Sequence, residues 1–559
     1  MDRRTLLFVA ISVAIIILYQ EFVLKRYAPA PVPSDAPTAT ERGPSQTEPP
    51  AASAVAAGAA PTATGTAPAT DEVAPLLPET KSKPVEGQRI TVETDLYTAV
   101  FTTVGGRLED FRLKDYRETN SADSPLLPLV LPAPEIEFPL GVELRGARAW
   151  RDSNQVYEAD RSSLSISGAS EATLTLRTVF NGHPIVKKLT FRGDQYPIDM
   201  VVETPPAAAL PAEVIQATPD GKPAAVALLL TRARKKDEDD VMFEGPSALI
   251  ADELVQTPFD DLEGPEVFEG KVDWAGFEDH YFLVAAAPER ATSVRMLPKG
   301  NAVEEKILTP RAATGPTNLA FTLYLGPKDR PTLEAAGHEF AKGLNFGWFA
   351  PIALILLQVL EYSHRLTGNW GIDIILLTIL VKILFWPLTR KSFSSMRDMQ
   401  KLQPEMARIR EKYKDDSQKM NTEVMELYKR HGVNPLGGCL PMLLQIPVFI
   451  GLYQLLQNTI QLRHAPFAFW VTDLASPERL YILGYGIPVL TLLLGASMFL
   501  QQKLSPQAGD PNQQRIMMFM PVVFTFMFIG FPAGLTLYWL TNNVLTIAQQ
   551  WWMLRSAPT

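Results

Sequence analysis

Lys382 is the residue of greatest chemical interest, because it lies within the apolar segment 374–388. A cation in the middle of a bilayer costs about 2.5–3.5 kcal/mol on insertion scales, so it is expected to face a polar cavity or a partner. The alternative is that the long stem of the lysine carries the ammonium to the membrane edge. Arg390 follows eight residues later, roughly 12 Å along a helix, and the residues alone leave both interpretations open.

Neutral polar side chains in this and the other C-terminal apolar segments could line the same cavity. Any one of them ordinarily serves as a hydrogen-bonding group between helices, whereas together with Lys382 they would suffice for a wet cleft. The only carboxylate in the five C-terminal apolar segments is Asp373, at the outer end of the first, which argues against a proton-coupled pump. The neutral residues are Thr378, Gln445, Gln454, Gln457, Thr525, Thr536, Thr541, Asn542 and Asn543.

Other kinds of chemistry find little support in the sequence. The region 89–335 has no Ser/His/Asp set, metal-ligand spacing or carboxylate pair, and its histidines, His183 and His280, are widely separated. The net charge of −9 argues against direct nucleic-acid recognition, and the single cysteine, Cys439, excludes a disulfide framework. We therefore expect no enzymatic activity, no cofactor and no metal, and we interpret the region 89–335 as a scaffold or partner surface.

Five apolar segments in the last third of the chain must position the polar residues, at 371–388, 436–460, 481–500, 516–530 and 535–554. A sixth apolar segment follows Arg3 and Arg4 at the N-terminus. The polar segment 389–434 carries eleven basic residues against seven acidic ones, which places it in the cytoplasm by the positive-inside rule. Six spans put Arg3, Arg4 and Arg555 on the same side, whereas a seventh span would separate the N-terminal arginines from the basic segment.

The N-terminal segment 1–27 is interpreted as an uncleaved signal anchor whose N-terminus lies in the cytoplasm. A cleaved signal peptide is the alternative, but no Ala-x-Ala site adjoins the apolar core. Residues 28–88 are rich in Pro, Ala, Thr and Ser and have few large apolar side chains. This composition predicts a flexible linker.

Residues 89–335 have the pattern of a β-sandwich. Short alternating or β-branched segments at 90–93, 173–179, 185–191 and 198–203 are separated by Pro, Gly and Asp, and Gly105–Gly106 is expected to form a turn or a bulge. In the next region, 336–370, the apolar run has only about 14 residues, fewer than the roughly 20 that a span needs. We predict an amphipathic helix there, lying at the periplasmic interface of the membrane.

The polar segment 389–434 also has helical periodicity. Met399, Leu402, Met406 and Ile409 recur at intervals of three and four residues, and the second half repeats this pattern. The pattern predicts a cytoplasmic helical hairpin. It is either a solvated hairpin without a further role or a surface that receives substrate or a ribosome-side partner.

Several motifs in a fixed order resemble the YidC/Oxa/Alb family of membrane protein insertases, in its Gram-negative YidC form. The resemblance runs through most of 371–552, and the N-terminal anchor, linker and β region fit the same form by layout. The motifs are NPLGGCLP at 434–441, QIP at 445–447, LRHAPFAFW at 462–470, QQKLSP at 501–506, FMP at 519–521 and FPAGLTLYW at 531–539.

The resemblance implies an α-helical membrane protein with six transmembrane helices, five of which form an insertase core at 371–555, and a large periplasmic β-supersandwich domain. It also implies a hydrophilic substrate groove open to the cytoplasm and to lipid. Lys382 stands where family members normally carry an arginine, Thr378 matches a groove threonine, and Gln445 is assigned to the same groove. Tyr538 and Trp539 match a pair often written Tyr-Tyr. Lysine keeps the positive charge of arginine but lacks its bidentate fork.

We therefore expect a membrane protein insertase and chaperone of the bacterial inner membrane, with both termini in the cytoplasm. The expected partners are nascent membrane proteins, the lipid bilayer, the Sec translocon with its accessory subunits, and the ribosome at the hairpin 389–434. The alternative is a transporter of small molecules or lipids that uses the same cavity. A transporter predicts inverted internal repeats, and the sequence has no clear repeat.

Overall fold

The computed structural model describes residues 76–77, 87–121, 123–132, 136–218, 221–234, 244–312, 315–414, 416–433, 440–504 and 511–555. The predicted anchor at 1–27 and most of the predicted linker at 28–88 lie outside these residues. The chain divides into two compact units. One unit combines Ala67–Arg390 with Cys439–Thr559, and the other combines Met1–Thr66 with Lys391–Gly438.

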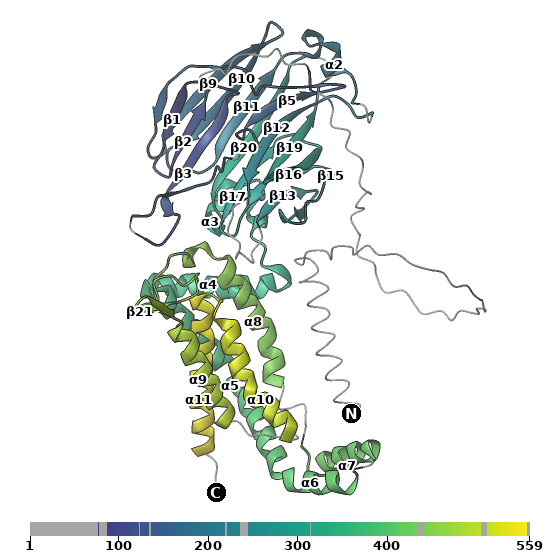
Figure 1. Cartoon of the computed structure of the whole chain (residues 1–559), viewed down its shortest axis with the longest axis vertical. Coiled ribbons are helices and arrows are strands. Elements are labelled where there is room, and N and C mark those ends of the chain that lie inside the picture. The colour runs from purple at the N-terminus through teal and green to yellow at the C-terminus, as the bar shows by residue number, and fades with distance from the viewer. Residues whose placement is uncertain are drawn as a thin grey trace, which may run out of the picture. The chain divides into compact units, whose positions relative to one another are not determined.

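Strands β1 to β20 form three sheets, in which every neighbouring pair of described strands is antiparallel except β1 and β8 (Figure 1). The five-stranded sheet has the order β4(Leu126–Pro128), β3(Arg107–Arg117), β2(Tyr97–Thr102), β1(Arg89–Glu93) and β8(Ser163–Ser165). The nine-stranded sheet has the order β14(Glu253–Gln256), β13(Gly245–Ile250), β16(Val272–Glu278), β17(Phe282–Pro288), β20(Thr317–Pro327), β11(Ile198–Thr204), β10(His183–Arg192), β9(Glu171–Phe180) and β7(Glu158–Ala159). The six-stranded sheet has the order β15(Glu266–Glu269), β18(Ser293–Lys299), β19(Ala302–Pro310), β12(Ala225–Ala233), β5(Gly141–Arg145) and β6(Ala149–Arg151).

The alternation of apolar residues determines which side of each strand is buried. In β11, Ile198, Met200 and Val202 are buried, and the residues between them are partly exposed. The four segments predicted as strands lie within β1, β9, β10 and β11, so these predictions are confirmed. Gly105 and Gly106 both have a positive φ and form the turn between β2 and β3, also as predicted.

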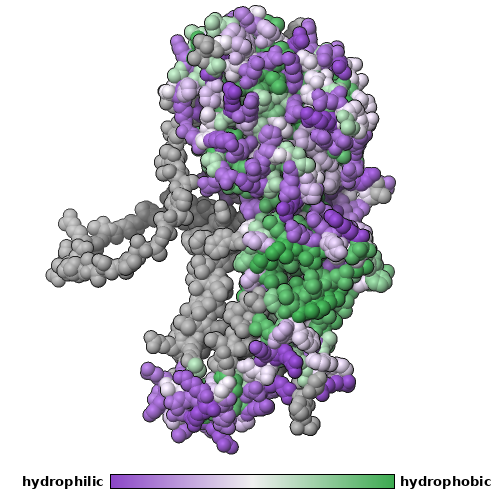
Figure 2. Space-filling view, turned by 180° about the vertical axis from the view of Figure 1, so that it is seen from behind, coloured by the Kyte–Doolittle hydropathy of each residue, from purple (hydrophilic) through white to green (hydrophobic). Residues whose placement is uncertain are grey.

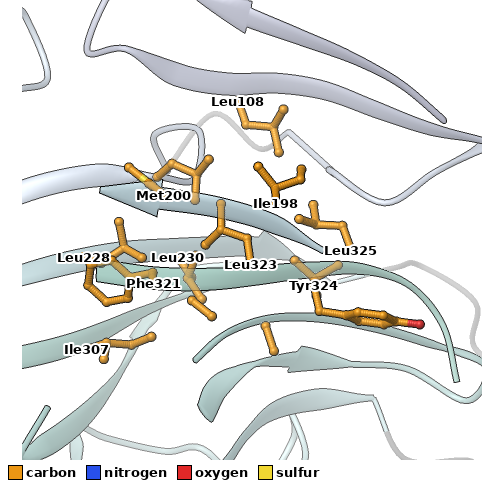
Figure 3. Close-up of a cluster of buried hydrophobic side chains, with 14 of the residues drawn as sticks. Leu108, Ile198, Met200, Leu228, Leu230, Ile307, Phe321, Leu323, Tyr324 and Leu325 are labelled. Carbon is orange, nitrogen blue, oxygen red and sulfur yellow. The ribbon is translucent and has the colours of Figure 1, made fainter. Parts of the chain in front are cut away.

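Side chains from all three sheets meet in one hydrophobic core, part of which is shown in Figure 3. The strands β11 and β20 are hydrogen-bonded neighbours, and their apolar side chains stand opposite one another in register. This packing, rather than disulfides, stabilises the domain, because the chain has a single cysteine. The labelled residues are Leu108 of β3, Ile198 and Met200 of β11, Leu228 and Leu230 of β12, Ile307 of β19, and Phe321, Leu323, Tyr324 and Leu325 of β20.

The rest of the described chain is mainly helical. Helix α9 packs against both α10 and α11, and α4 packs against α8 (Figure 1). In the described part of the chain, α5 alone is both long enough and apolar enough to cross a membrane. The helices are the short α2(Ala212–Ile215), α3(Arg330–Ala336), α4(Ala350–Thr367), α5(Trp370–Lys401), α6(Gln403–Lys412), α7(Ser417–Arg430), α8(Leu440–Asn458), α9(Val489–Leu504), α10(Pro511–Phe528) and α11(Ala533–Arg555).

One predicted boundary is wrong. The segment 481–500 is not one helix, because β21(Leu480–Ile482) and β22(Tyr485–Ile487) form a hairpin and α9 begins only at Val489. The helix that contains the apolar segment 371–388 is α5, which continues through Pro387 to Lys401 and so includes the start of the segment predicted as a helical hairpin. Helices α6 and α7 follow it, and Leu402, Met406 and Leu427 form a small core between them.

Candidate functional site

Helix α5 positions two of the predicted groove residues. Its N-terminus is fixed by Asn369, whose side-chain oxygen accepts hydrogen bonds from the backbone N–H groups of Gly371 and Ile372. Thr378 is fully buried, and its hydroxyl donates to the carbonyl of Ile374 at 2.6 Å, one turn earlier on the same helix. Thr378 is therefore satisfied within α5 and is held one turn before Lys382.

Lys382 reaches across to α11. Its ammonium donates to the hydroxyl oxygen of Thr546 at 2.7 Å, and that hydroxyl in turn donates to the carbonyl of Asn542 at 2.6 Å. Within the described residues, Thr546 is the only hydrogen-bond partner of this ammonium, and no carboxylate forms an ion pair with it. The charge is thus held at a helix interface by one neutral group.

A hollow of about 270 Å³ lies beside this hydrogen bond. Its lining is mostly apolar, so a polar group that entered it would find few partners other than Lys382 and Gln549. In α11, Gln549 is nearly buried, and its amide nitrogen has no partner within the described residues. The hollow is lined by Ile379, Lys382, Ile383 and Trp386 from α5 and by Leu545, Ala548, Gln549 and Trp552 from α11.

A second polar contact joins α8 to α11. The side-chain amide of Gln445 donates to the hydroxyl oxygen of Tyr538 at 2.7 Å, and Tyr538 is buried. The next residue, Trp539, packs edge-on against Phe449 of α8 and Phe528 of α10. Its indole N–H is buried and has no hydrogen-bond partner in the described part of the chain.

The five predicted residues therefore fall into separate groups. Lys382 is the only one of them that lines the hollow. Gln445 and Tyr538 contact each other, Thr378 bonds within its own helix, and Trp539 lies in an aromatic cluster. Tyr538 and Thr546 lie eight residues apart on α11, roughly 12 Å by helical rise.

Comparisons with known proteins cover both parts of the chain. The family model for the 60Kd inner membrane protein matches residues 362–559, and the model for the YidC periplasmic domain matches residues 89–359. The membrane protein insertase YidC of Nitratidesulfovibrio vulgaris strain Miyazaki F is 41% identical over 487 residues, covering 85% of this chain and 87% of that protein. The chain belongs to the YidC family of membrane protein insertases.

Two further matches extend over most of this insertase. The membrane protein insertase YidC of Oleidesulfovibrio alaskensis strain G20 is 40% identical over 576 residues and covers both chains completely. A crystal structure of an active YidC insertase with its first transmembrane domain resolved is 18% identical, with a TM-score of 0.37, covering 86% of this chain and 95% of the other. Family membership makes this chain an inner-membrane insertase with a periplasmic β-rich domain and a helical C-terminal region.

The structure adds two candidate site residues that could not be singled out from the sequence, Thr546 and Gln549. Together with Asn542 they recur on α11 at intervals of four and three residues, which places them on one side of the helix. This spacing was the available signal. A neutral polar residue inside a span costs much less than a cation, so the residues alone do not distinguish Thr546 and Gln549 from the other neutral residues of the spans.

Proposed function

We propose that this insertase admits a polar stretch of a nascent membrane protein into the hollow between α5 and α11, with Lys382 as the principal attracting group. The observation that carries the proposal is the ammonium of Lys382, which is held by one hydroxyl next to an open hollow between α5 and α11. A protonated amine has three donors. An incoming carboxylate would therefore find donors that Thr546 does not occupy.

In the proposed mechanism, no covalent bond forms or breaks. The hydrophilic end of the client enters the hollow, where Lys382 and Gln549 replace part of its lost hydration. The apolar segment of the client then moves between the helices into lipid. Burial of apolar surface, at about 25 cal/mol per Å², supplies the net driving force. Thr378, Gln445, Tyr538 and Trp539 are proposed to line the same path deeper in the core.

The topology that accompanies this mechanism has six spans, an uncleaved N-terminal anchor at 1–27 and a core at 371–555. Both termini and the helices α6 and α7 would lie in the cytoplasm. We also propose that α4 lies at the periplasmic interface, and that the hairpin 389–434 meets the ribosome while the core works with or without the Sec translocon. The excess of basic residues in 389–434 supports the cytoplasmic assignment.

The test is insertion of a client with an acidic N-terminal tail into vesicles that contain the full-length protein. Lys382→Glu is expected to reduce insertion at least tenfold, because two like charges would meet in a site of low dielectric constant. Lys382→Arg is expected to stay within about threefold of the parent, since the charge is retained. Lys188→Glu in β10 is the matched control, because it makes the same charge change in the β domain. Equal insertion by the parent and all three variants would exclude Lys382 from the mechanism.

Crosslinking tests which of the proposed positions contact the client. A photoreactive residue at Thr378, Lys382 or Trp539 is expected to capture a stalled nascent membrane protein. A crosslinker at Arg177, an exposed residue of β9, serves as the control. Capture from Arg177 but from none of the three core positions would contradict the proposed path.

A further inference from the structure

The connection between α8 and α9 contains a hairpin whose tip is apolar. Strands β21 and β22 pair in register, with Tyr481 opposite Gly486 and Ile482 opposite Tyr485. The two-residue turn consists of Leu483 and Gly484, with φ of 52° and 85°. Turns of this kind favour Asn, Asp or Gly at the first position, whereas leucine is strained there. The chain thus has a leucine at a position whose backbone conformation disfavours leucine.

The leucine at the tip gains no packing within the described chain. Leu483 is 94% exposed, and Tyr481 and Tyr485 are 73% and 76% exposed. Successive residues of a strand point to opposite faces, so Tyr481 and Ile482 lie on different sides of the ribbon. Both faces and the tip are therefore apolar and uncovered. A protein partner would cover one face of the ribbon, whereas lipid would surround both faces and the tip.

The base of the hairpin is held by polar contacts. Glu478 is buried, and its carboxylate accepts hydrogen bonds from the indole of Trp470 at 2.8 Å and from the backbone N–H of Thr491 at 3.2 Å. The guanidinium of Arg479 donates to the carbonyl of Ile529 at 3.1 Å. These bonds tie the hairpin to the helices, so the position of the tip is set by the core.

The apolar surface continues from the hairpin into α9. No charged residue occurs between Arg479 and Lys503, and α9 begins two residues after β22. Leu492 and Leu493 of α9 are about half exposed. Hydrophobic residues cover a broad area of the helical region in Figure 2. The apolar tip is thus followed in the sequence by a helix whose exposed surface is also apolar, as a lipid-facing surface requires.

We propose that the hairpin 480–487 is a lipid anchor whose tip lies in the interfacial layer of the outer leaflet. Tyrosine favours this layer. The outer edges of a two-stranded ribbon carry unpaired backbone groups, which cannot be satisfied in the hydrocarbon interior, so the tip is expected to remain shallow. The leaflet assignment rests on the proposed topology, but the anchor requires neither the hollow nor Lys382.

The experiment measures the depth of the tip in the full-length protein reconstituted in vesicles of neutral phospholipid. Cys439→Ser removes the only cysteine, and Leu483→Cys then carries an environment-sensitive fluorophore. Arg177→Cys, labelled in the same way, is the exposed control in the β domain. The probe at 483 is expected to be quenched at least threefold more strongly than the control by lipids that carry a nitroxide near the headgroup. It should also be at least threefold less accessible to aqueous iodide.

A second variant separates lipid contact from the integrity of the hairpin. Leu483→Asn relieves the backbone strain, because asparagine tolerates a positive φ, and it also removes the apolar tip. With the fluorophore at Tyr485→Cys, this change is expected to raise quenching by iodide at least twofold. The proposal of a lipid anchor would be refuted if Leu483→Asn left iodide quenching of the probe at 485 unchanged. It would also be refuted if iodide quenched the probe at 483 as strongly as the control. Shielding that appears only at high protein-to-lipid ratio, without quenching by lipid, would assign the tip to a second copy of the chain and would also overturn it. No client protein takes part, so this result is independent of the insertion mechanism.

Discussion

Asp152→Asn should destabilise the β domain strongly, although it changes only one atom of the side chain. Asp152 and Lys187 form an ion pair at 2.7 Å in which both side chains are completely buried. The ammonium also donates to three backbone carbonyls, those of Gly105, Gly106 and Leu140. Burial lowers the pKa of Lys187 to about 8 despite the favourable carboxylate, so the ammonium still carries its proton at pH 7.

The size of the effect follows from the partners of the carboxylate. Besides Lys187, it accepts hydrogen bonds from the guanidinium of Arg107, the backbone N–H of Val142 and the hydroxyl of Tyr157. Asparagine keeps one acceptor oxygen, but it replaces the other with an N–H₂ donor that faces the donors formerly bound by that oxygen. Each buried donor left unpaired costs about 1–3 kcal/mol, and removing one partner of a buried ion pair costs about 3–5 kcal/mol. We expect a loss of about 3–5 kcal/mol in the free energy of opening.

Hydrogen exchange of the full-length protein at pH 7 measures this loss in the amides of β10. At about 1.4 kcal/mol for each factor of ten, exchange should accelerate by two to three and a half powers of ten. Glu203→Gln is the matched control, because it removes the carboxylate of the exposed pair that Glu203 forms with Lys188, the next residue along β10. An exposed pair contributes about 0–1 kcal/mol, so the control should change exchange less than about fivefold.

The double variant Lys187→Met with Asp152→Asn should recover part of the protection, because it removes the buried cation that Asp152→Asn leaves unpaired. If the β10 amides of Asp152→Asn exchange within fivefold of the parent rate, or if the double variant is no better protected than the single one, the unpaired ammonium of Lys187 does not destabilise the domain.

Two further predictions concern a buried acid and the partner of Lys382. Glu305 is fully buried in β19, its carboxylate has no partner within the described residues, and burial raises its pKa well above the usual value. The folded chain therefore holds a proton that the unfolded chain releases near pH 4.5, so stability falls as the pH rises above that value, and Glu305→Gln should remove this fall in urea unfolding between pH 5 and 8. Thr546→Val should leave the fold intact and reduce insertion of an acidic client several-fold, since the ammonium of Lys382 loses the hydroxyl that orients it. The control is Thr525→Val, which removes a hydroxyl bonded within α10 and should leave insertion unchanged.

The sequence predicted the strands better than the ends of the helices. Alternating residues such as Ile198, Met200 and Val202 identify a strand because the period of two is independent of distant contacts. The hairpin at 480–487 escaped prediction because its residues and those of α9 form one continuous apolar run. Gly484, Gly486 and Pro488 were the available signals that the run is interrupted. Asn181–Gly182, which joins β9 and β10 with both φ values positive, was a similar signal for a two-residue turn.

Lys382 could be identified from the sequence because a cation within an apolar segment carries a large free-energy cost. It could not find the partner of Lys382, since Thr546 lies 164 positions later and many neutral residues in the spans were equivalent candidates. The positions of Gln445 and Tyr538 relative to the hollow could not be predicted either. Their contact with each other is well defined, but the residues alone do not reveal that it is separate from the hollow.

Lys187, which is completely buried, and Lys382, which is partly buried, differ in how many of their donors have partners. Lys187 is matched by a carboxylate and three carbonyls, so nothing further can bind it without breaking the domain. Lys382 has one hydroxyl partner within the described residues and lies beside a hollow. A buried charge with unmet donors gains free energy from any acceptor that reaches it, whereas a fully matched charge gains none. Loss of the carboxylate at 152 should therefore affect stability, and loss of the ammonium at 382 should affect insertion.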